Sequence, residues 1–123
     1  MYARSESEYE FGLTGYLLRG TLYRATYYMS DPTVLILASL AEGDKHGYAI
    51  MEDIHTFAGI RLGPGTLYGA ISRLEKCGWI RAVKSDSRRQ PYRITSEGSL
   101  ELKKQLALFG QVVRTGNRRL KEA

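Results

Sequence analysis

The fold is decided by residues 63–80, which read GPGTLYGAISRLEKCGWI. Gly63 and Pro64 indicate a helix start, because proline lacks the N–H group that the first turn of a helix leaves unpaired. Gly78 indicates the helix end, since glycine adopts the left-handed conformation found at helix C-termini without steric cost. We therefore predict a helix that begins at Pro64 and ends at Cys77.

Projection at about 100° per residue gives this helix an apolar and a polar face. The apolar face, expected to pack on the core, consists of Leu67, Ala70, Ile71 and Leu74, with Cys77 at its edge. The polar face consists of Gly65, Gly69, Ser72, Arg73 and Lys76, flanked by Thr66 and Tyr68. The first half of this face has small side chains, so the backbone could approach a DNA groove there, while Ser72 and Arg73 reach base edges or phosphates. A solvated face without a partner would carry the same residue types.

A basic hairpin is predicted directly after this helix. Two β-rich segments, residues 79–84 and 91–95, flank the polar stretch 85–90. Five cations on this hairpin face a single acid, Asp86; they are Arg81, Lys84, Arg88, Arg89 and Arg93. Adjacent arginines repel each other on a turn but suit phosphates or a narrow minor groove. We interpret the hairpin as a DNA-binding wing, with contacts from Lys84, Ser85, Arg88, Arg89, Gln90 and Arg93. The alternative is a solvated loop.

Positive charge is concentrated in this part of the chain. Residues 61–93 hold eight basic and two acidic residues, a net charge of +6, whereas the whole chain of 123 residues carries +5. A basic zone confined to one stretch suggests a surface that binds a polyanion. The alternative is a winged-helix protein-interaction or effector-sensing module without specific DNA binding. Unpaired wing cations argue against it, because a protein-binding wing has no need of them.

Two shorter helices are predicted before residue 63. The first is a buried helix over residues 33–42, capped by Ser30 or Asp31, with Pro32 at its first position and Gly43 as a left-handed end. The second runs to Ala58, and His46 helps to cap its start. The face expected to pack consists of Tyr48, Met51, Ile54, Phe57 and Ala58. Gly59 ends this helix, and residues 60–62 are expected to form a short strand.

Helices at both ends of the chain are predicted to build a homodimer. Apolar positions recur at spacings of four and three over residues 10–29 and again after Ser96. The two helices therefore present more apolar surface than one small domain can bury. We expect dimer contacts from Phe11, Leu18, Leu22, Met29, Leu102, Leu106, Phe109, Val113 and Leu120. The N-terminal helix also carries Tyr9, Tyr16 and Tyr23, and a docking face for another protein or an aromatic effector is the competing interpretation.

The predicted fold is mainly α with a small β-hairpin, a winged helix-turn-helix with additional terminal helices. Residues 1–31 form the N-terminal extension, 32–95 the DNA-binding domain and 96–123 the dimerisation helix. His46, His55 and Cys77 lack the spacing of a zinc site, and Cys77 is expected to be a small buried residue. We expect no metal, no cofactor and no enzyme activity. The chain shows no apolar run that could cross a membrane, and a cytoplasmic location is expected.

Three ordered motifs resemble the PadR family of bacterial transcriptional regulators. They are HGYAI at residues 46–50, the stretch 63–80 already quoted, and RRQPYRIT at residues 88–95. The resemblance runs from about Val34 to Leu102. The union of such a domain with extra helices is also similar to cyanobacterial clock-modifying regulators of the Pex type.

The resemblance implies a winged-helix homodimer, usually a repressor, that binds a palindromic operator through its third helix and wing. It also implies a C-terminal helix that dimerises. Two departures concern the DNA-binding surface. Gly69 stands where the family often has proline, and Gln90-Pro91-Tyr92 stands in place of a common Arg-Lys-Tyr-Tyr. The operator sequence therefore does not carry over.

Overall fold

The structure is a computed structural model that describes residues 31–122. The helix predicted over residues 10–29 lies outside the described residues. Its predicted dimer contacts Phe11, Leu18, Leu22 and Met29, and its tyrosines, lie outside them as well.

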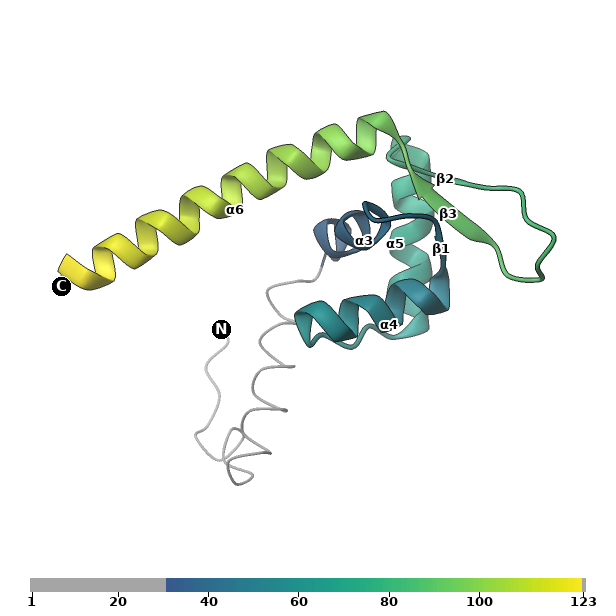
Figure 1. The fold of residues 1–123 in the computed structure, drawn as a ribbon, viewed down its shortest axis with the longest axis horizontal. Helices are drawn as coiled ribbons and strands as arrows, with labels where there is room; N and C mark the ends of the chain where they lie inside the picture. The colour runs from purple at the N-terminus through teal and green to yellow at the C-terminus, as the bar shows by residue number, and fades with distance from the viewer. Residues whose placement is uncertain (1–30, 123) are drawn as a thin grey trace, which may run out of the picture.

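Within this range the chain forms α3 (Thr33–Leu40), β1 (Lys45–His46), α4 (Gly47–Ala58), α5 (Pro64–Cys77), β2 (Ile80–Ala82), β3 (Pro91–Ile94) and α6 (Ser96–Glu122). The strands form one antiparallel sheet in the order β1-β3-β2. In Figure 1, α3, α4 and α5 pack together, the hairpin of β2 and β3 projects to one side, and α6 leaves the domain as a long rod. This arrangement confirms the predicted winged helix with an added C-terminal helix.

The core lies where α3, α4 and α5 meet. The apolar face of α5 is as predicted, because Leu67, Ala70, Ile71 and Leu74 are at most 2% exposed. The facing side chains on the other elements are Ile36, Leu37, Leu40, Ile50, Ile54 and Ile80. Full burial of one such side chain stabilises a fold by about 1.5–3 kcal/mol. Packing of α5 against this cluster leaves its polar face directed outward.

The first strand does not lie where the sequence analysis placed it. Residues 60–62 form no strand, and β1 lies before α4 instead. Lys45 pairs with Tyr92, and His46 pairs with Pro91. A strand of two residues is too short to show an alternation of apolar and polar positions in the sequence. Only its pairing with β3 identifies β1 as a strand. The prediction for residues 60–62 was therefore wrong.

The ends of α3 differ from the prediction. The carboxylate of Asp31 accepts a hydrogen bond from the first helical N–H at 3.2 Å, but Pro32 stands just before the helix rather than at its first position. The helix ends early, at Leu40, and Gly43 has a φ of 157° rather than the left-handed value expected. The N–H of Gly43 still donates to the carbonyl of Leu40 at 3.1 Å, and the Nζ of Lys45 donates to the carbonyl of Ser39 in the last turn at 2.5 Å.

The buried face of α4 also differs from the prediction. Tyr48 and Phe57 are 56% and 50% exposed, whereas Ile50, absent from the predicted face, is fully buried. Ile54 is buried as predicted. The helix therefore turns Ile50 and Ile54 toward the core and Gly47 toward Tyr68 of α5, and its two aromatic side chains are exposed.

The first turn of α6 fixes this helix to the domain. The hydroxyl of Thr95 accepts a hydrogen bond from the N–H of Gly98 at 3.0 Å and donates to the carbonyl of Gly78 at 2.6 Å. A Cβ at Gly98 would overlap the backbone carbonyl oxygen of Trp79. The helix and the chain after α5 therefore approach more closely than any side chain at this position would permit.

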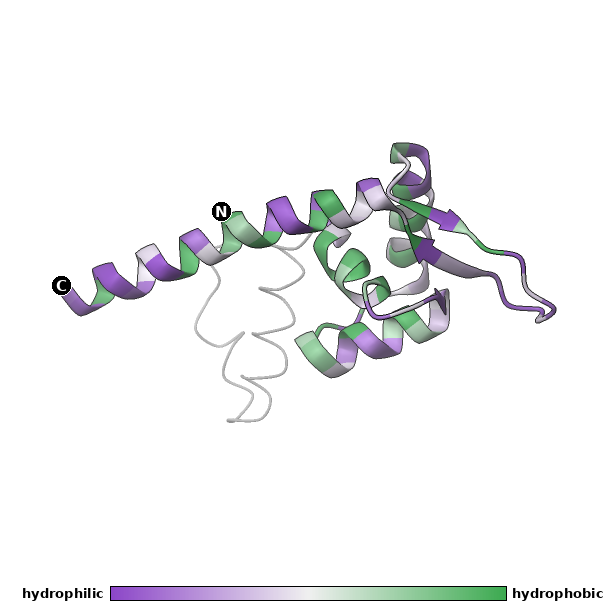
Figure 2. Cartoon of the chain, turned by 45° about the horizontal axis from the view of Figure 1, so that its top comes forward, coloured by the Kyte–Doolittle hydropathy of each residue, from purple (hydrophilic) through white to green (hydrophobic). Residues whose placement is uncertain are grey.

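Beyond its first turns, α6 carries apolar side chains on an exposed surface. Leu102, predicted as a dimer contact, is only 7% exposed and packs in the core of its own domain, so little of its side chain is accessible to a partner. The other predicted contacts on this helix, Leu106, Phe109, Val113 and Leu120, are exposed. Figure 2 shows hydrophobic residues that recur along α6 to its far end.

Gly98→Ala should lower the free energy of unfolding by about 1–3 kcal/mol, the usual range for an overpacked contact. The atom that the new methyl group would overlap belongs to the backbone and cannot rotate away. Gly116→Ala is the matched control, since a Cβ there meets no atom of residues 31–122 within 4 Å. Helix propensity predicts that this control gains up to about 1 kcal/mol. Chemical denaturation followed by circular dichroism measures both, and a Gly98→Ala variant as stable as wild type would contradict the close contact.

Candidate nucleic-acid interface

The polar face of α5 is open to solvent along the whole helix. The exposed residues include every one predicted there, namely Gly65, Thr66, Tyr68, Gly69, Ser72, Arg73 and Lys76. A Cβ at Gly65 or Gly69 would meet no atom within 4 Å in the part of the chain that the structure describes. The backbone of the first half of α5 is therefore accessible to a large partner.

Tyr68 lies over the start of α4. A Cβ at Gly47 would overlap the hydroxyl and the ring of Tyr68, so the absence of a side chain there makes room for this ring. Tyr68 remains 49% exposed. It therefore links the polar face of α5 to the surface around the start of α4.

Arg73 reaches from α5 to the residue that caps α3. Its Nη2 donates to Oδ1 of Asp31 at 2.8 Å. Partial burial works to raise the pKa of Asp31, but hydrogen bonds from Thr33 and the charge of Arg73 outweigh this and leave the pKa below its ordinary value. This contact occupies one donor of a guanidinium that is still half exposed, and Ser72 beside it is exposed as well.

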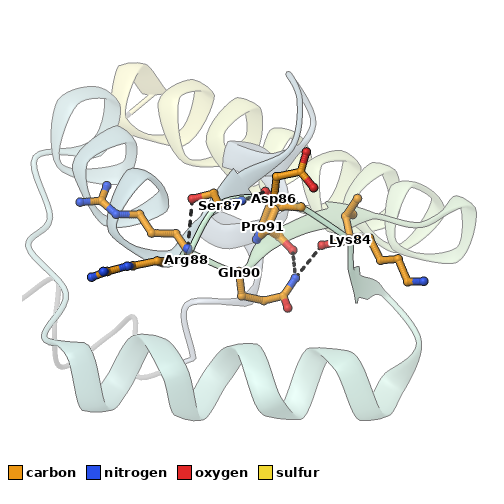
Figure 3. A pocket seen from close by; sticks show the side chains of 9 residues that line it. Lys84, Asp86, Ser87, Arg88, Gln90 and Pro91 are labelled. Carbon is orange, nitrogen blue, oxygen red and sulfur yellow. Dashed lines mark hydrogen bonds between the residues drawn. The ribbon is translucent and has the colours of Figure 1, made fainter.

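The loop between β2 and β3, residues 83–90, is the predicted wing, and its own polar groups set its shape. The side-chain amide of Gln90 donates to the carbonyls of Val83 at 2.8 Å and Pro91 at 2.7 Å, as Figure 3 shows. The hydroxyls of Ser85 and Ser87 accept hydrogen bonds from backbone N–H groups of the loop. Ser85 and Gln90, predicted as DNA contacts, therefore also hold the wing in shape.

The cations of the wing point outward from this frame. Lys84 and Arg88 extend to opposite sides of the loop in Figure 3. Lys84, Arg88 and Arg89 are exposed, and no carboxylate of residues 31–122 lies within ion-pair distance of them. Each brings an uncompensated positive charge to the same end of the domain.

Arg93 differs from the other wing cations. Its Nε donates to Oδ1 of Asp44 at 2.9 Å and its Nη2 to Oδ2 at 2.7 Å. The hydrogen bond and the charge of Arg93 hold the pKa of Asp44 below its ordinary value, so the pair stays ionised at neutral pH. The expectation that Asp86 is the only acid facing these cations was therefore wrong. Asp44 lies just before β1 and 49 positions from Arg93, so no pattern in the sequence pointed to this ion pair. The pair ties β3 to the turn before β1.

Two side chains at the start of α4 join this surface, although the sequence analysis did not assign them to it. The Nδ1 of His46 accepts from the N–H of Ala49 at 3.2 Å, which confirms the predicted cap. Arg89 places its Nη1 3.2 Å from the Nε2 of His46 and its guanidinium carbon 5.9 Å from the ring centroid of Tyr48. The contact of Arg89 with Tyr48 requires the Tyr48 ring to be exposed, whereas the sequence analysis expected this ring to pack in the core. The contact therefore could not be predicted from the sequence.

Metal binding and membrane insertion find no support among residues 31–122. No group of three or more His, Cys, Asp and Glu side chains there could hold a metal ion. None of the helices in this range has the length and apolar character to span a bilayer. Cys77 is exposed rather than buried as predicted, because α5 ends at this residue, beyond its contact with the core.

Comparison with known proteins assigns the family. The model of the transcriptional regulator PadR-like family matches residues 36–104. An uncharacterized 37.1 kDa protein in transposon TN4556 of Streptomyces fradiae is 44% identical over 69 residues, which are 56% of this chain and 20% of that protein. The match thus spans about a fifth of the length of this curated relative.

Solved structures agree with this assignment. A transcriptional regulator from Clostridium thermocellum superposes with a TM-score of 0.67 at 31% identity, over 76% of this chain and 94% of that one. A PadR family transcription regulator from hypervirulent Clostridium difficile R20291 gives a TM-score of 0.65 at 27% identity, over 72% and 96%. The chain therefore belongs to the PadR-like family of transcriptional regulators.

Proposed function

We propose that the chain is a homodimeric repressor that binds a palindromic operator through α5 and the wing. The observation that carries the proposal is the set of exposed cations Lys84, Arg88 and Arg89, which no carboxylate of residues 31–122 neutralises. They lie beside a helix face whose backbone is accessible at Gly65 and Gly69. A phosphate backbone supplies the missing counter-charge, and the major groove admits such a helix.

In the proposed complex α5 enters the major groove and the wing contacts the flanking backbone or minor groove. Ser72 and Arg73 read base edges, and the other exposed residues of α5 contact bases or phosphates. The wing contacts are Lys84, Ser85, Arg88, Arg89 and Gln90. Arg93 contributes mainly by holding β3 in place, because its guanidinium is paired with Asp44. A dimer seated on a promoter represses by excluding other proteins from the same DNA.

The homodimer is supported by the exposed apolar side chains of α6. Val113 is 59% and Leu120 76% exposed on a helix that extends beyond its own domain. A second copy would cover them, and the two-fold symmetry of such a dimer would place two α5 helices in successive major grooves about 34 Å apart. The operator would then be an inverted repeat.

Selection from a library of random duplexes, with sedimentation of the resulting complex, tests the proposal. The expected result is an inverted repeat whose half-sites are about 10–10.5 base pairs apart, bound by two copies of the chain. Recovery of no preferred sequence, with binding that is weak and uniform, would instead support a module that lacks specific DNA recognition.

Arg88→Ala/Arg89→Ala should weaken binding to every duplex to the same degree. The slope of log affinity against log salt should become shallower by about 0.9 for each phosphate that the variant no longer neutralises. Lys103→Ala/Lys104→Ala, on α6, removes the same charge and is the control, which should leave the slope unchanged. Fluorescence anisotropy across a salt series measures both. Identical slopes for wild type and the wing variant would remove the wing from the interface.

Gly69→Ala should stabilise the protein and weaken its binding to the selected operator. Helix propensity favours alanine by up to about 1 kcal/mol, and a Cβ at this position meets no atom of the described chain. The same methyl group would lie between α5 and the groove, and we expect at least a roughly fivefold loss of affinity, about 1 kcal/mol. Thermal melts and operator titrations measure the two effects. Gains in both stability and affinity would show that α5 stays away from the groove at this point.

Val113→Glu should raise the dimer dissociation constant at least about tenfold, because an unpaired carboxylate would be buried in the dimer. Gln111→Glu adds the same charge at an exposed position on another side of α6 and should leave the dimer intact. Analytical ultracentrifugation measures both variants. Dimers of equal stability would place the interface elsewhere.

A further inference from the structure

The ring of His46 has only one nitrogen that can accept a hydrogen bond in its neutral form. Its Nδ1 is already used, because it accepts from the N–H of Ala49 at 3.2 Å and thereby caps α4. The proton of the neutral ring therefore lies on Nε2, which becomes a donor. A protonated ring would donate from Nε2 as well.

Arg89 places a second donor directly opposite this one. Its Nη1 lies 3.2 Å from the Nε2 of His46, and a guanidinium group carries N–H donors and no acceptor. Two donors at this distance do not satisfy each other. The arrangement lacks an acceptor that could serve both groups at once.

Other contacts keep Arg89 in this position. Its guanidinium lies 5.9 Å from the ring centroid of Tyr48, within the range of a cation–π contact, and its backbone N–H donates to the hydroxyl of Ser87 at 3.1 Å. The guanidinium of Arg89 is therefore held opposite His46 because the wing packs on the start of α4.

The two donors border a hollow of about 310 Å³ between the start of α4, α5 and the wing. Tyr48, Tyr68 and Tyr92 contribute to its lining, and no acidic side chain does. The ring of Tyr68 is seated here by the room that Gly47 leaves. The hollow thus offers hydrogen-bond donors and positive charge to a ligand that supplies several acceptor oxygens.

We propose that this hollow binds one backbone phosphate of the DNA, whose oxygens accept from Nε2–H of His46 and from the guanidinium of Arg89. This inference rests on the proposed function and adds His46 to the interface. A phosphate group matches the site because it is anionic and has oxygens enough to serve both donors. The clamp joins the wing to α4 in the complex and so orients the wing relative to α5.

The test uses His46→Asn, which retains a capping oxygen for α4 but lacks the outer N–H of the imidazole. A 20-base-pair duplex of arbitrary sequence serves as the probe, because a backbone contact needs no operator. We expect an affinity about three- to tenfold lower, the loss of one hydrogen bond, with an unchanged melting temperature of the protein. His55→Asn changes a histidine within α4 that lies outside the hollow, and this control should bind like wild type.

A double-mutant cycle with Arg89→Gln shows whether the two residues act on the same phosphate. Shared contact predicts that the combined loss of affinity is smaller than the product of the two single losses. Additive losses, or a His46→Asn variant that binds like wild type, would overturn the clamp. If Arg88→Ala/Arg89→Ala weakens binding while His46→Asn does not, the proposed function stands and this inference fails.

Nitrogen-15 NMR of the histidine rings separates backbone phosphate from free phosphate. The duplex should shift the Nε2 signal of His46, whereas inorganic phosphate at the same ionic strength should leave it near its position in the free protein. A full shift with inorganic phosphate alone would identify a small-anion site and overturn the assignment to DNA. An Nε2 signal that the bound duplex leaves unchanged would overturn it as well.

Discussion

The contact on which the surface of this protein depends is the burial of the apolar face of α5. Leu67, Ile71 and Leu74 are at most 2% exposed, and each contributes about 1.5–3 kcal/mol through burial. Once these side chains are fixed in the core, the helix cannot rotate about its axis. The opposite face must then point to solvent, so the position of the candidate DNA contacts follows from core packing and requires no separate device.

The wing needs additional contacts, because two short strands alone would hold it weakly. β3 pairs with both other strands, and the Arg93–Asp44 ion pair ties it to the turn before β1. Arg89 adds a contact with Tyr48 at the start of α4. The wing is thus oriented by α4 and its preceding turn, which brings the start of α4 beside the proposed DNA contacts of the wing.

The sequence predicted features that local chemistry determines and missed those that depend on distant partners. Pro64 and Gly78 mark the two ends of α5, and periodicity separates its two faces, so the bounds and the polar face of this helix could be identified from the sequence, although Cys77 was wrongly expected to be buried. β1 could not, because a two-residue strand exists only through its pairing with β3. The exposure of Tyr48 was missed for a similar reason, since α4 is oriented by Ile50 and by the ring of Tyr68 above Gly47. Asp31 and Asp44 could not be assigned to their arginines, because no periodicity connects residues more than forty positions apart.

These two carboxylates divide the basic residues into two groups with different roles. Arg73 and Arg93 are paired with Asp31 and Asp44, so part of their charge serves the fold before any DNA is present. Lys84, Arg88 and Arg89 have no carboxylate partner among residues 31–122, and their repulsion works against the wing. Hydrogen bonds from the amide of Gln90, which salt hardly affects, keep the loop closed despite this repulsion. Salt should therefore affect the wing in two opposite ways. It screens the repulsion among these cations in the free loop, and it would weaken their proposed attraction to DNA.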